Sequence, residues 1–171
     1  MNVLKSVLNN IDKFNEKMAK IFAWAMLLLT LTMTYEVVSR YGFNKPTIWS
    51  YDVSYMLGSM VLIFGMAYTL RIGGHVTIDL IYNRFSRRVQ LIMYIIFTIV
   101  LFFPLWALMV KVMIPHTLFS WAKHESSWVG TWQPIVYPFK TWVTVGTIML
   151  VLQGTAEFIR DIVELIGGER P

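Results

Sequence analysis

Residues 89–110 read VQLIMYIIFTIVLFFPLWALMV, a run of 22 residues without a charged side chain. A helix needs roughly 20 mainly apolar residues to cross about 30 Å of hydrocarbon, so this run predicts a transmembrane helix. Pro104 lacks a backbone N–H, and we expect it to kink that helix. The run indicates that the chain folds in a membrane and not in water.

Further apolar runs lie on both sides of this one. They predict spans at residues 21–40, 51–70 and 141–159, which together with residues 89–110 make four transmembrane helices. Of the 171 residues, 56% are hydrophobic and 15% are charged, whereas a soluble domain has about a quarter charged residues. We therefore expect an all-α integral membrane protein, with residues 1–171 forming a single membrane domain.

Two segments outside the spans are predicted to lie at the membrane surface. Residues 1–20 have apolar side chains at helical spacing and charged ones mostly on the other side, which is typical of an amphipathic interfacial helix. Residues 111–140 contain three prolines and three tryptophans, and tryptophan concentrates at the membrane–water boundary. We expect this second segment to be interfacial and periplasmic, a short helix plus an extended piece, and residues 160–171 to form a cytoplasmic tail.

Basic side chains are divided unevenly between the two sides of the membrane. Ten of the 15 lysines and arginines lie in the N-terminal segment, the loop between spans two and three, and the tail. The positive-inside rule places this richer side, and both termini with it, in the cytoplasm. A net charge of +5 would suggest nucleic acid in a soluble protein, but here the basic residues flank membrane spans, so we expect no nucleic-acid partner.

Several classes of chemistry find no support in the sequence. The absence of cysteine excludes disulfides, thiolate metal sites and cysteine nucleophiles. A b-type haem in a helix bundle needs histidines inside the spans, whereas His75, His116 and His124 all fall outside them. No catalytic triad, nucleophile elbow or zinc motif is present. We therefore predict no enzymatic activity, no metal and no cofactor.

The most informative charges stand at the end of the first span and the start of the second. Glu36 and Arg40 are one helical turn apart and share a face. Such a carboxylate either couples transport to protons or substrate, or forms a neutral pair that holds the first helix against a neighbour. The pair is favoured, because Glu36 lies at the end of the span and Arg40 is close enough to be its partner. Asp52 follows Trp49 in the first turn of span two and suits the positive end of the helix dipole, with a contact to Arg40 as an alternative.

Small residues mark one face in each of two spans. Span two has Ser54, Gly58 and Gly65, and span four has Gly146 and Gly154. In lipid, such faces let helix backbones approach closely. The sequence predicts helix packing at these positions, either within this chain or against a partner.

The loop between spans two and three contains a glycine pair between charged residues. Arg71 precedes Gly73 and Gly74, and His75 and Asp79 follow them. A phosphate-binding loop is one interpretation, but the strand–loop–helix context of nucleotide-binding loops is missing. We expect instead a sharp turn into a short interfacial helix, with the arginines at anionic lipid headgroups.

Three short patterns of residues lie along the chain. In chain order they are Glu36-x-x-x-Arg40-Tyr41-Gly42-Phe43 followed by Trp49 and Asp52; then Ala67, Arg71, His75, Val76 and Asp79; then Glu125-Ser126-Ser127. Taken together, these patterns resemble the small (DctQ-type) membrane subunit of tripartite ATP-independent periplasmic (TRAP) transporters. The resemblance extends over most of the chain and includes the number of spans. One departure is Asp52, where that family more often has glutamate.

The resemblance implies a place in a larger assembly in the bacterial inner membrane. A large multi-span subunit would hold the substrate and ion sites of the symporter, and a periplasmic binding protein would deliver an organic acid or a sugar acid. This chain would be the scaffold, in contact with both partners and with membrane lipids. The positions expected to be structural or interfacial are Glu36, Arg40, Tyr41, Trp49, Asp52, Arg71, His75 and Asp79, and those expected to face the binding protein are Trp121, Trp128 and Trp132.

Two other functions stay open at this point. The chain is also compatible with a small four-helix exporter that expels drugs in exchange for protons through Glu36. It is compatible, too, with an anchor subunit of another membrane complex. The exporter predicts transport by the pure chain alone, whereas a scaffold alone transports nothing.

Overall fold

A computed structural model describes residues 2–73, 85–129 and 131–167 of the chain. Four helical stretches in it are long and apolar enough to cross a membrane. Within the described ranges there is no β-strand, only one isolated antiparallel bridge between Ser126 and Ile135. The elements are α1 (Asn2–Val37) with the π-helical turn η1 (Val38–Gly42), α2 (Ser50–Arg71), α4 (Arg87–Phe97), the π-helical turn η2 (Thr98–Phe102), α5 (Phe103–Lys123) and α6 (Tyr137–Leu165). The prediction of an all-α protein with four membrane helices is confirmed.

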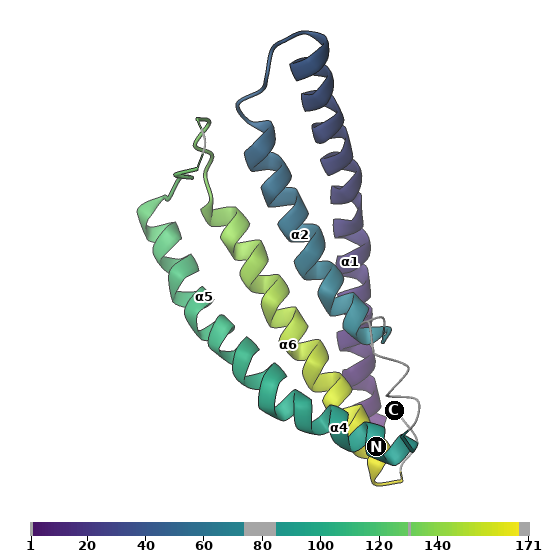
Figure 1. Cartoon of the computed structure of the whole chain (residues 1–171). Coiled ribbons are helices and arrows are strands. Elements are labelled where there is room, and N and C mark those ends of the chain that lie inside the picture. The colour runs from purple at the N-terminus through teal and green to yellow at the C-terminus, as the bar shows by residue number, and fades with distance from the viewer. Residues whose placement is uncertain (1, 74–84, 130, 168–171) are drawn as a thin grey trace.

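The helices lie side by side in the order α1, α2, α6, α5 (Figure 1), with α2 packed on α1 and on α6, and α5 packed on α6. Both ends of the chain lie at the same end of the bundle, close to α4 (Figure 1). We call this end the terminal end. The other end, which we call the loop end, holds the connection over residues 43–49 and the segment over residues 124–136.

The first helix is longer than the predicted span. Residues 2–20, expected to form a separate interfacial helix, continue without a break into the span over residues 21–40. The reason is that the stretch up to Tyr41 contains neither glycine nor proline, so nothing interrupts the backbone hydrogen bonds. At 1.5 Å per residue this 36-residue helix is about 54 Å long. One face of its N-terminal half packs against the rest of the protein, since Leu8 and Asn15 are buried, whereas Val7 and Phe14 are exposed.

The third span is likewise extended at its C-terminal end. Residues 111–123, expected to belong to an interfacial segment over 111–140, continue α5, and the helix ends where His124 adopts a left-handed conformation. The bend expected at Pro104 is preceded by the π-helical turn η2, and α4, η2 and α5 together follow a curved path (Figure 1). Proline cannot donate to the carbonyl four residues earlier and its ring crowds that carbonyl, so the turn before it widens.

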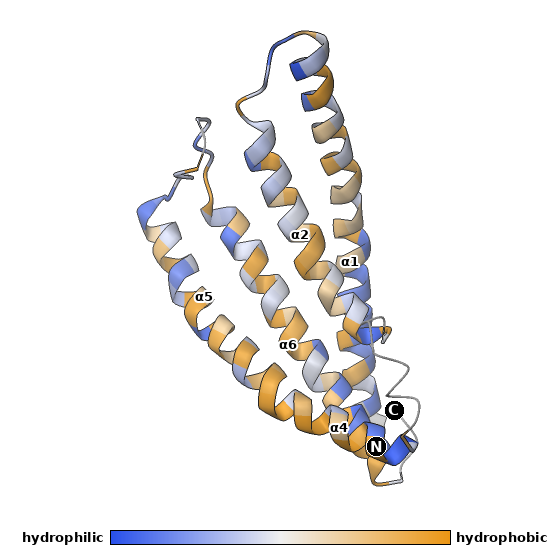
Figure 2. Cartoon of the chain, in the orientation of Figure 1, coloured by the Kyte–Doolittle hydropathy of each residue, from blue (hydrophilic) through white to orange (hydrophobic). Residues whose placement is uncertain are grey.

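The bundle core is small and aromatic. Phe22 of α1 stacks on Phe64 of α2 with 3.9 Å between ring centroids, and Ile63 and Met149 are buried beside them. Apolar residues also cover much of the outside of α1 and α5, whereas hydrophilic residues gather at the terminal end (Figure 2). An apolar exterior of this kind is what contact with lipid requires.

The small residues predicted to pack helices differ in their surroundings. A Cβ atom at Gly146 would come within 2.8 Å of Ile63 on α2, and one at Gly154 within 2.2 Å of the Phe102 ring on η2. Both glycines of α6 therefore allow close approach within this chain. On α2, a Cβ atom added at Gly58 would lie about 4.0 Å from Leu29 of α1, and Ser54 contacts Met33 of α1. A Cβ atom added at Gly65 would face open space.

Gly154→Ala is expected to destabilise the protein, because the added methyl group collides with a ring that is itself packed between neighbouring aromatic side chains. Overpacking of this kind costs about 1–3 kcal/mol. The measurement is the thermal unfolding midpoint of the purified protein in mild detergent. Gly65→Ala is the matched control and should leave the midpoint unchanged or raise it slightly, because alanine favours helix; equal midpoints for the two variants would contradict the packing at Gly154.

Candidate functional site

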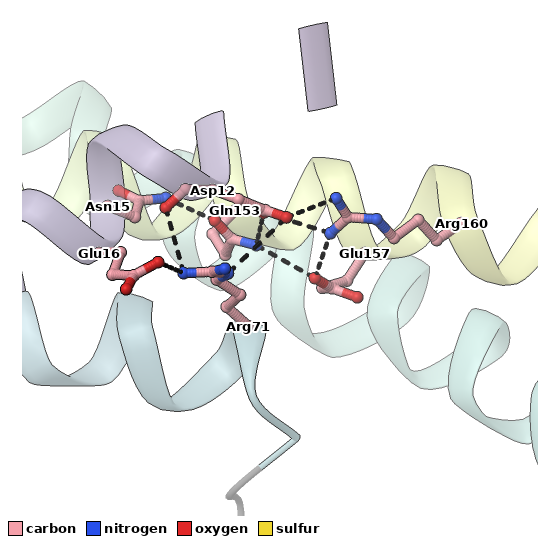
Figure 3. Close-up of polar contacts among 7 residues, drawn as sticks. All are labelled: Asp12, Asn15, Glu16, Arg71, Gln153, Glu157 and Arg160. Carbon is pink, nitrogen blue, oxygen red and sulfur yellow. Dashed lines mark hydrogen bonds and ion pairs between the residues drawn. The ribbon is translucent and has the colours of Figure 1, made fainter. Parts of the chain in front are cut away.

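A cluster of polar side chains joins three helices near the terminal end of the bundle (Figure 3). α1 contributes one turn of polar residues, α2 contributes its last residue, and α6 contributes three residues that share a face. All lie in helices that are otherwise mainly apolar. We call this set the polar cluster; its members are Asp12, Asn15, Glu16, Arg71, Gln153, Glu157 and Arg160.

Arg160 of α6 lies at one end of the polar cluster and is only 6% exposed. Its Nη2 donates to Oδ2 of Asp12 at 2.7 Å, and its Nη1 donates to Oε1 of Glu157 at 2.6 Å. The guanidinium therefore joins the N-terminal half of α1 to the C-terminal half of α6, across 148 residues of sequence. A guanidinium between two carboxylates is a strong, charge-assisted arrangement.

Gln153 connects the two helices about two turns of α6 before Arg160. Its Nε2 donates to Oδ1 of Asp12 at 2.9 Å and to Oε1 of Glu157 at 3.1 Å, and its Oε1 accepts from Nδ2 of Asn15 at 2.5 Å. Both amide side chains are buried. An amide that uses its donors and its acceptor in this way fixes the register of α1 against α6, because a shift of either helix leaves buried polar atoms unpaired.

Arg71 brings α2 into the same cluster. Its Nη1 donates to Oε2 of Glu16 at 2.6 Å, and its Nε lies 3.7 Å from Oδ2 of Asp12. On the outer side, Lys20 forms an ion pair of 2.7 Å with Glu16. Asp12 thus lies between two guanidinium groups, one from α2 and one from α6.

The polar cluster is electrically balanced once Lys20 is included, with three carboxylates and three cations. Bringing charges out of water is expensive, and attraction repays this only when each charge has close, hydrogen-bonded partners. These contacts provide such partners, so the arrangement holds three helices together. It shows no nucleophile activated by a base, and no group of acidic or histidine side chains in the described ranges could hold a metal ion.

The first predicted charge pair lies at the loop end. Oε1 of Glu36 accepts from Nε of Arg40 at 2.7 Å, and Oε2 accepts from the backbone N–H of Thr47 at 3.0 Å and from the Thr47 hydroxyl. Glu36 is buried, whereas Arg40 is exposed. The carboxylate therefore binds the connection between α1 and α2 back onto the end of α1.

The neighbouring predicted residues have separate surroundings. Trp49 stacks on Tyr35 with 5.8 Å between ring centroids, and Tyr41 is exposed. Asp52 is 3% exposed, and one of its carboxylate oxygens has no hydrogen-bond partner among the described residues. The alternative contact from Asp52 to Arg40 is not found among the ion pairs of these ranges, since Arg40 pairs with Glu36.

The structure describes only the first part of the predicted pattern in the loop between α2 and α4. Arg71 was expected to face lipid headgroups, and the structure instead turns it into the polar cluster. His75 and Asp79, like Val76 and Gly74, lie outside the described residues.

The tryptophans predicted to form one surface lie in different environments. Trp121 donates from Nε1 to the Thr141 hydroxyl at 2.8 Å and packs on Tyr137, so it belongs to the contact between α5 and α6. Trp128 is 91% exposed, and Trp132 is 44% exposed. These last two lie in the connection between α5 and α6, which projects from the loop end.

Backbone hydrogen bonds and one ion pair fix the base of this connection. The N–H of Ser127 donates to the carbonyl of Pro134 at 2.7 Å, and the N–H of Val136 donates to the carbonyl of Glu125 at 3.0 Å. Lys140 Nζ lies 2.6 Å from Oε2 of Glu125. The hydrogen bond from this ammonium lowers the pKa of the Glu125 carboxyl below its ordinary value of 4.5.

Sequence reasoning missed most of the polar cluster. Asp12 and Glu16 were assigned to the outer face of an interfacial helix, and Arg160 was assigned to the tail. The signal was present in α6, where Gln153, Glu157 and Arg160 recur at spacings of four and three residues and so share one face of an apolar helix. Polar residues that share a face in a membrane helix point to a partner inside the protein.

Comparison with known protein families identifies a match over most of the chain. The family described as "Tripartite ATP-independent periplasmic transporters, DctQ component" matches residues 29–164. No curated protein matches the chain. The matched range includes Arg71, Gln153, Glu157 and Arg160, whereas the α1 half of the polar cluster lies before it.

Arg160→Met is expected to destabilise the bundle strongly, because it leaves Asp12 and Glu157 without their shared cation. Removing one partner of a buried pair costs about 3–5 kcal/mol, which should lower the thermal unfolding midpoint in detergent by roughly 6 °C or more. Arg88→Met makes the same chemical change at an exposed position of α4 and should shift the midpoint little. An equal decrease of the unfolding midpoint in both variants would argue against the ion-pair network.

Acid is expected to loosen the connection at the loop end. A carboxyl with a lower pKa in the folded than in the unfolded state stabilises the fold above its ordinary pKa, and this contribution is lost as the pH falls through the lowered value. Protection of the Val136 amide from hydrogen exchange should therefore stay constant from neutral pH down to about pH 5. It should decrease once the pH is lower than 4.5, the ordinary pKa of the carboxyl. Glu125→Gln should remove this pH dependence; protection in the native protein that persists throughout the acid range would contradict the role of the ion pair.

Proposed function

The chain belongs to the DctQ component family of tripartite ATP-independent periplasmic transporters, and from this premise we propose that it is the scaffold subunit of an ion-gradient-driven importer for an organic acid or a sugar acid. The family membership confirms the resemblance seen in the patterns around Glu36, Arg71 and Glu125. It makes the chain a small membrane subunit of a TRAP transporter. The family is a transporter component and not an enzyme family.

The observation that carries the scaffold proposal is the placement of charge in the four helices. Between the polar cluster at the terminal end and Glu36 at the loop end, the interior has stacked rings and aliphatic side chains around Phe22, Phe64 and Met149. The buried polar side chains of α5 and α6 in this stretch are uncharged, namely Thr117, Ser120, Thr144 and Thr147. Transport sites need inward polar groups and interrupted helices near the middle of the membrane. The charged groups of this bundle are paired at its two ends. Such fixed pairs suit a stationary part of a transporter better than a part that moves.

The exporter alternative requires Glu36 to take up and release protons from the middle of the bundle. Its carboxylate instead accepts hydrogen bonds from Arg40 and from the backbone and hydroxyl of Thr47, at the end of α1. This environment favours the scaffold over proton exchange. An anchor subunit of another kind of membrane complex is disfavoured by the family itself.

Two partners follow from the proposed function. The large multi-span subunit requires an apolar membrane face, which the exposed aliphatic and aromatic side chains along α1 and α5 offer to it and to lipid (Figure 2). The binding protein requires a surface outside the bacterial inner membrane. Because the basic residues are concentrated at the terminal end, the positive-inside rule favours a cytoplasmic terminal end and a periplasmic loop end.

The proposed function is tested by purification and uptake. A tagged copy of this chain, isolated in mild detergent, should bring the large membrane subunit with it. Uptake into vesicles should require that subunit, this chain, the binding protein and an ion gradient together. Isolation of the chain without a multi-span partner, or full uptake when this chain is left out, would contradict the proposal.

Trp128→Ala is expected to weaken binding of the binding protein to the membrane complex by about tenfold or more. Exposed tryptophans are the kind of side chain that contributes most at protein interfaces, and Trp128 projects from the loop end at 91% exposed. The measurement is a titration of the purified binding protein against the complex in detergent. Trp24→Ala removes a comparably exposed indole from the side of α1 and should leave the affinity unchanged; equal affinity for the native complex and the Trp128 variant would exclude this surface.

A further inference from the structure

An open hollow of about 490 Å³ lies on the outer face of α1, in the N-terminal half of the helix. Phe22, whose ring stacks on Phe64 in the core, is nine residues from Lys13. Nine residues make about two and a half helical turns, so these two side chains point in opposite directions and the hollow faces away from the bundle. The lining comes from α1 alone and consists of Lys13, Glu16, Lys17, Lys20, Ile21 and Trp24.

The basic side chains of this hollow keep positive charge available for a ligand. Lys13 and Lys17 are exposed, and neither forms an ion pair within residues 2–73, 85–129 and 131–167. Lys20 pairs with Glu16 at 2.7 Å, yet its side chain is 73% exposed. Glu16 also pairs with Arg71, so its single negative charge already has two cations beside it. We call Lys13, Lys17 and Lys20 the lysine face.

The lysine face leads directly into an apolar stripe on the same side of α1. Lys13, Lys17 and Lys20 follow one another at spacings of four and three residues, and Trp24, Leu28 and Leu31 continue that series. Trp24 is 70% exposed, and the two leucines are 55% and 64% exposed. Tryptophan concentrates where headgroups meet hydrocarbon, so the face presents cations, then a boundary residue, then aliphatic side chains.

This order matches the order of groups in a membrane lipid. An ammonium group binds a phosphate through strong, charge-assisted hydrogen bonds. From Trp24 to Leu31 is about 10 Å along α1, which lies within the roughly 15 Å of hydrocarbon that one leaflet provides. A phosphate at the lysines therefore places an acyl chain along the exposed leucines. An acidic protein segment would complement the charge alone and not the apolar stripe beyond it.

We propose that the lysine face binds one anionic phospholipid, such as phosphatidylglycerol. The phosphate accepts hydrogen bonds from the ammonium groups of Lys13 and Lys17, and an acyl chain lies along Leu28 and Leu31. A zwitterionic lipid has a cationic group that the lysines repel, so it binds more weakly. The proposal does not rest on the scaffold function, because the site is formed by α1 of this chain.

The test is native mass spectrometry of the purified protein in mild detergent, with three phospholipids of matched acyl chains added in equal amounts. One phosphatidylglycerol per chain should be retained, at least fivefold more than phosphatidylethanolamine or phosphatidylcholine, because each lysine near an anionic lipid contributes about fivefold in affinity. Inorganic phosphate at the same concentration should not displace it, since phosphate has no acyl chain. Equal retention of the three lipids, or displacement by inorganic phosphate, would overturn the proposal.

Paired double variants test the position of the lipid. Lys13→Gln with Lys17→Gln removes two charges from the lysine face, and Lys45→Gln with Lys123→Gln removes two exposed charges from the loop end. The first variant should retain at least fivefold less phosphatidylglycerol, whereas the second should retain the native amount. All four side chains are exposed, so the unfolding midpoints of both variants should stay close to that of the native protein.

A conservative variant separates charge from shape. Lys13→Arg with Lys17→Arg keeps both positive charges and should retain the lipid. Native retention of phosphatidylglycerol in the variant with two glutamines would overturn the proposal. If that variant also lost the large membrane subunit, the lysine face would instead belong to an acidic segment of a protein partner.

Discussion

The arrangement of this protein depends on the requirement that Asp12 and its neighbours have charged partners in a low-dielectric bundle. Arg71 from α2 and Arg160 from α6 lie on either side of this carboxylate. In water each of these pairs would contribute little. Inside a helix bundle, the cost of an unpaired charge is high enough to fix which three helices meet and at what register. Gln153 and Asn15 add further hydrogen bonds to the same layer.

This constraint connects the structure to the proposed role. The charges of the spans gather at the two ends of the bundle, where the polar cluster joins α1, α2 and α6, and Glu36 holds the connection between α1 and α2. The interior between them combines apolar packing around Phe22 and Phe64 with uncharged buried side chains such as Thr144 and Thr147. A chain of this kind suits the proposed scaffold, because it offers stable surfaces on which partners can assemble.

The fold class could be predicted from the sequence because the length and the apolar character of a span are local properties. The continuity of α1 through residues 2–37 does not follow from the amphipathic pattern of its N-terminal half, and only the absence of any helix breaker indicates it. The polar cluster was missed for a different reason: the contact between Asp12 and Arg160 bridges 148 residues, and sequence order alone does not show which helices become neighbours. The shared face of Gln153, Glu157 and Arg160 was the one local sign of it.

We infer that the ionisable groups of this chain hold its helices together and do not conduct protons across the membrane. The most direct measurement is proton flux into vesicles that contain the pure chain alone, under an imposed pH gradient and membrane potential, recorded with a pH-sensitive dye. We expect a proton flux no greater than that of empty vesicles. A flux well above that background, abolished by Glu36→Gln, would contradict it.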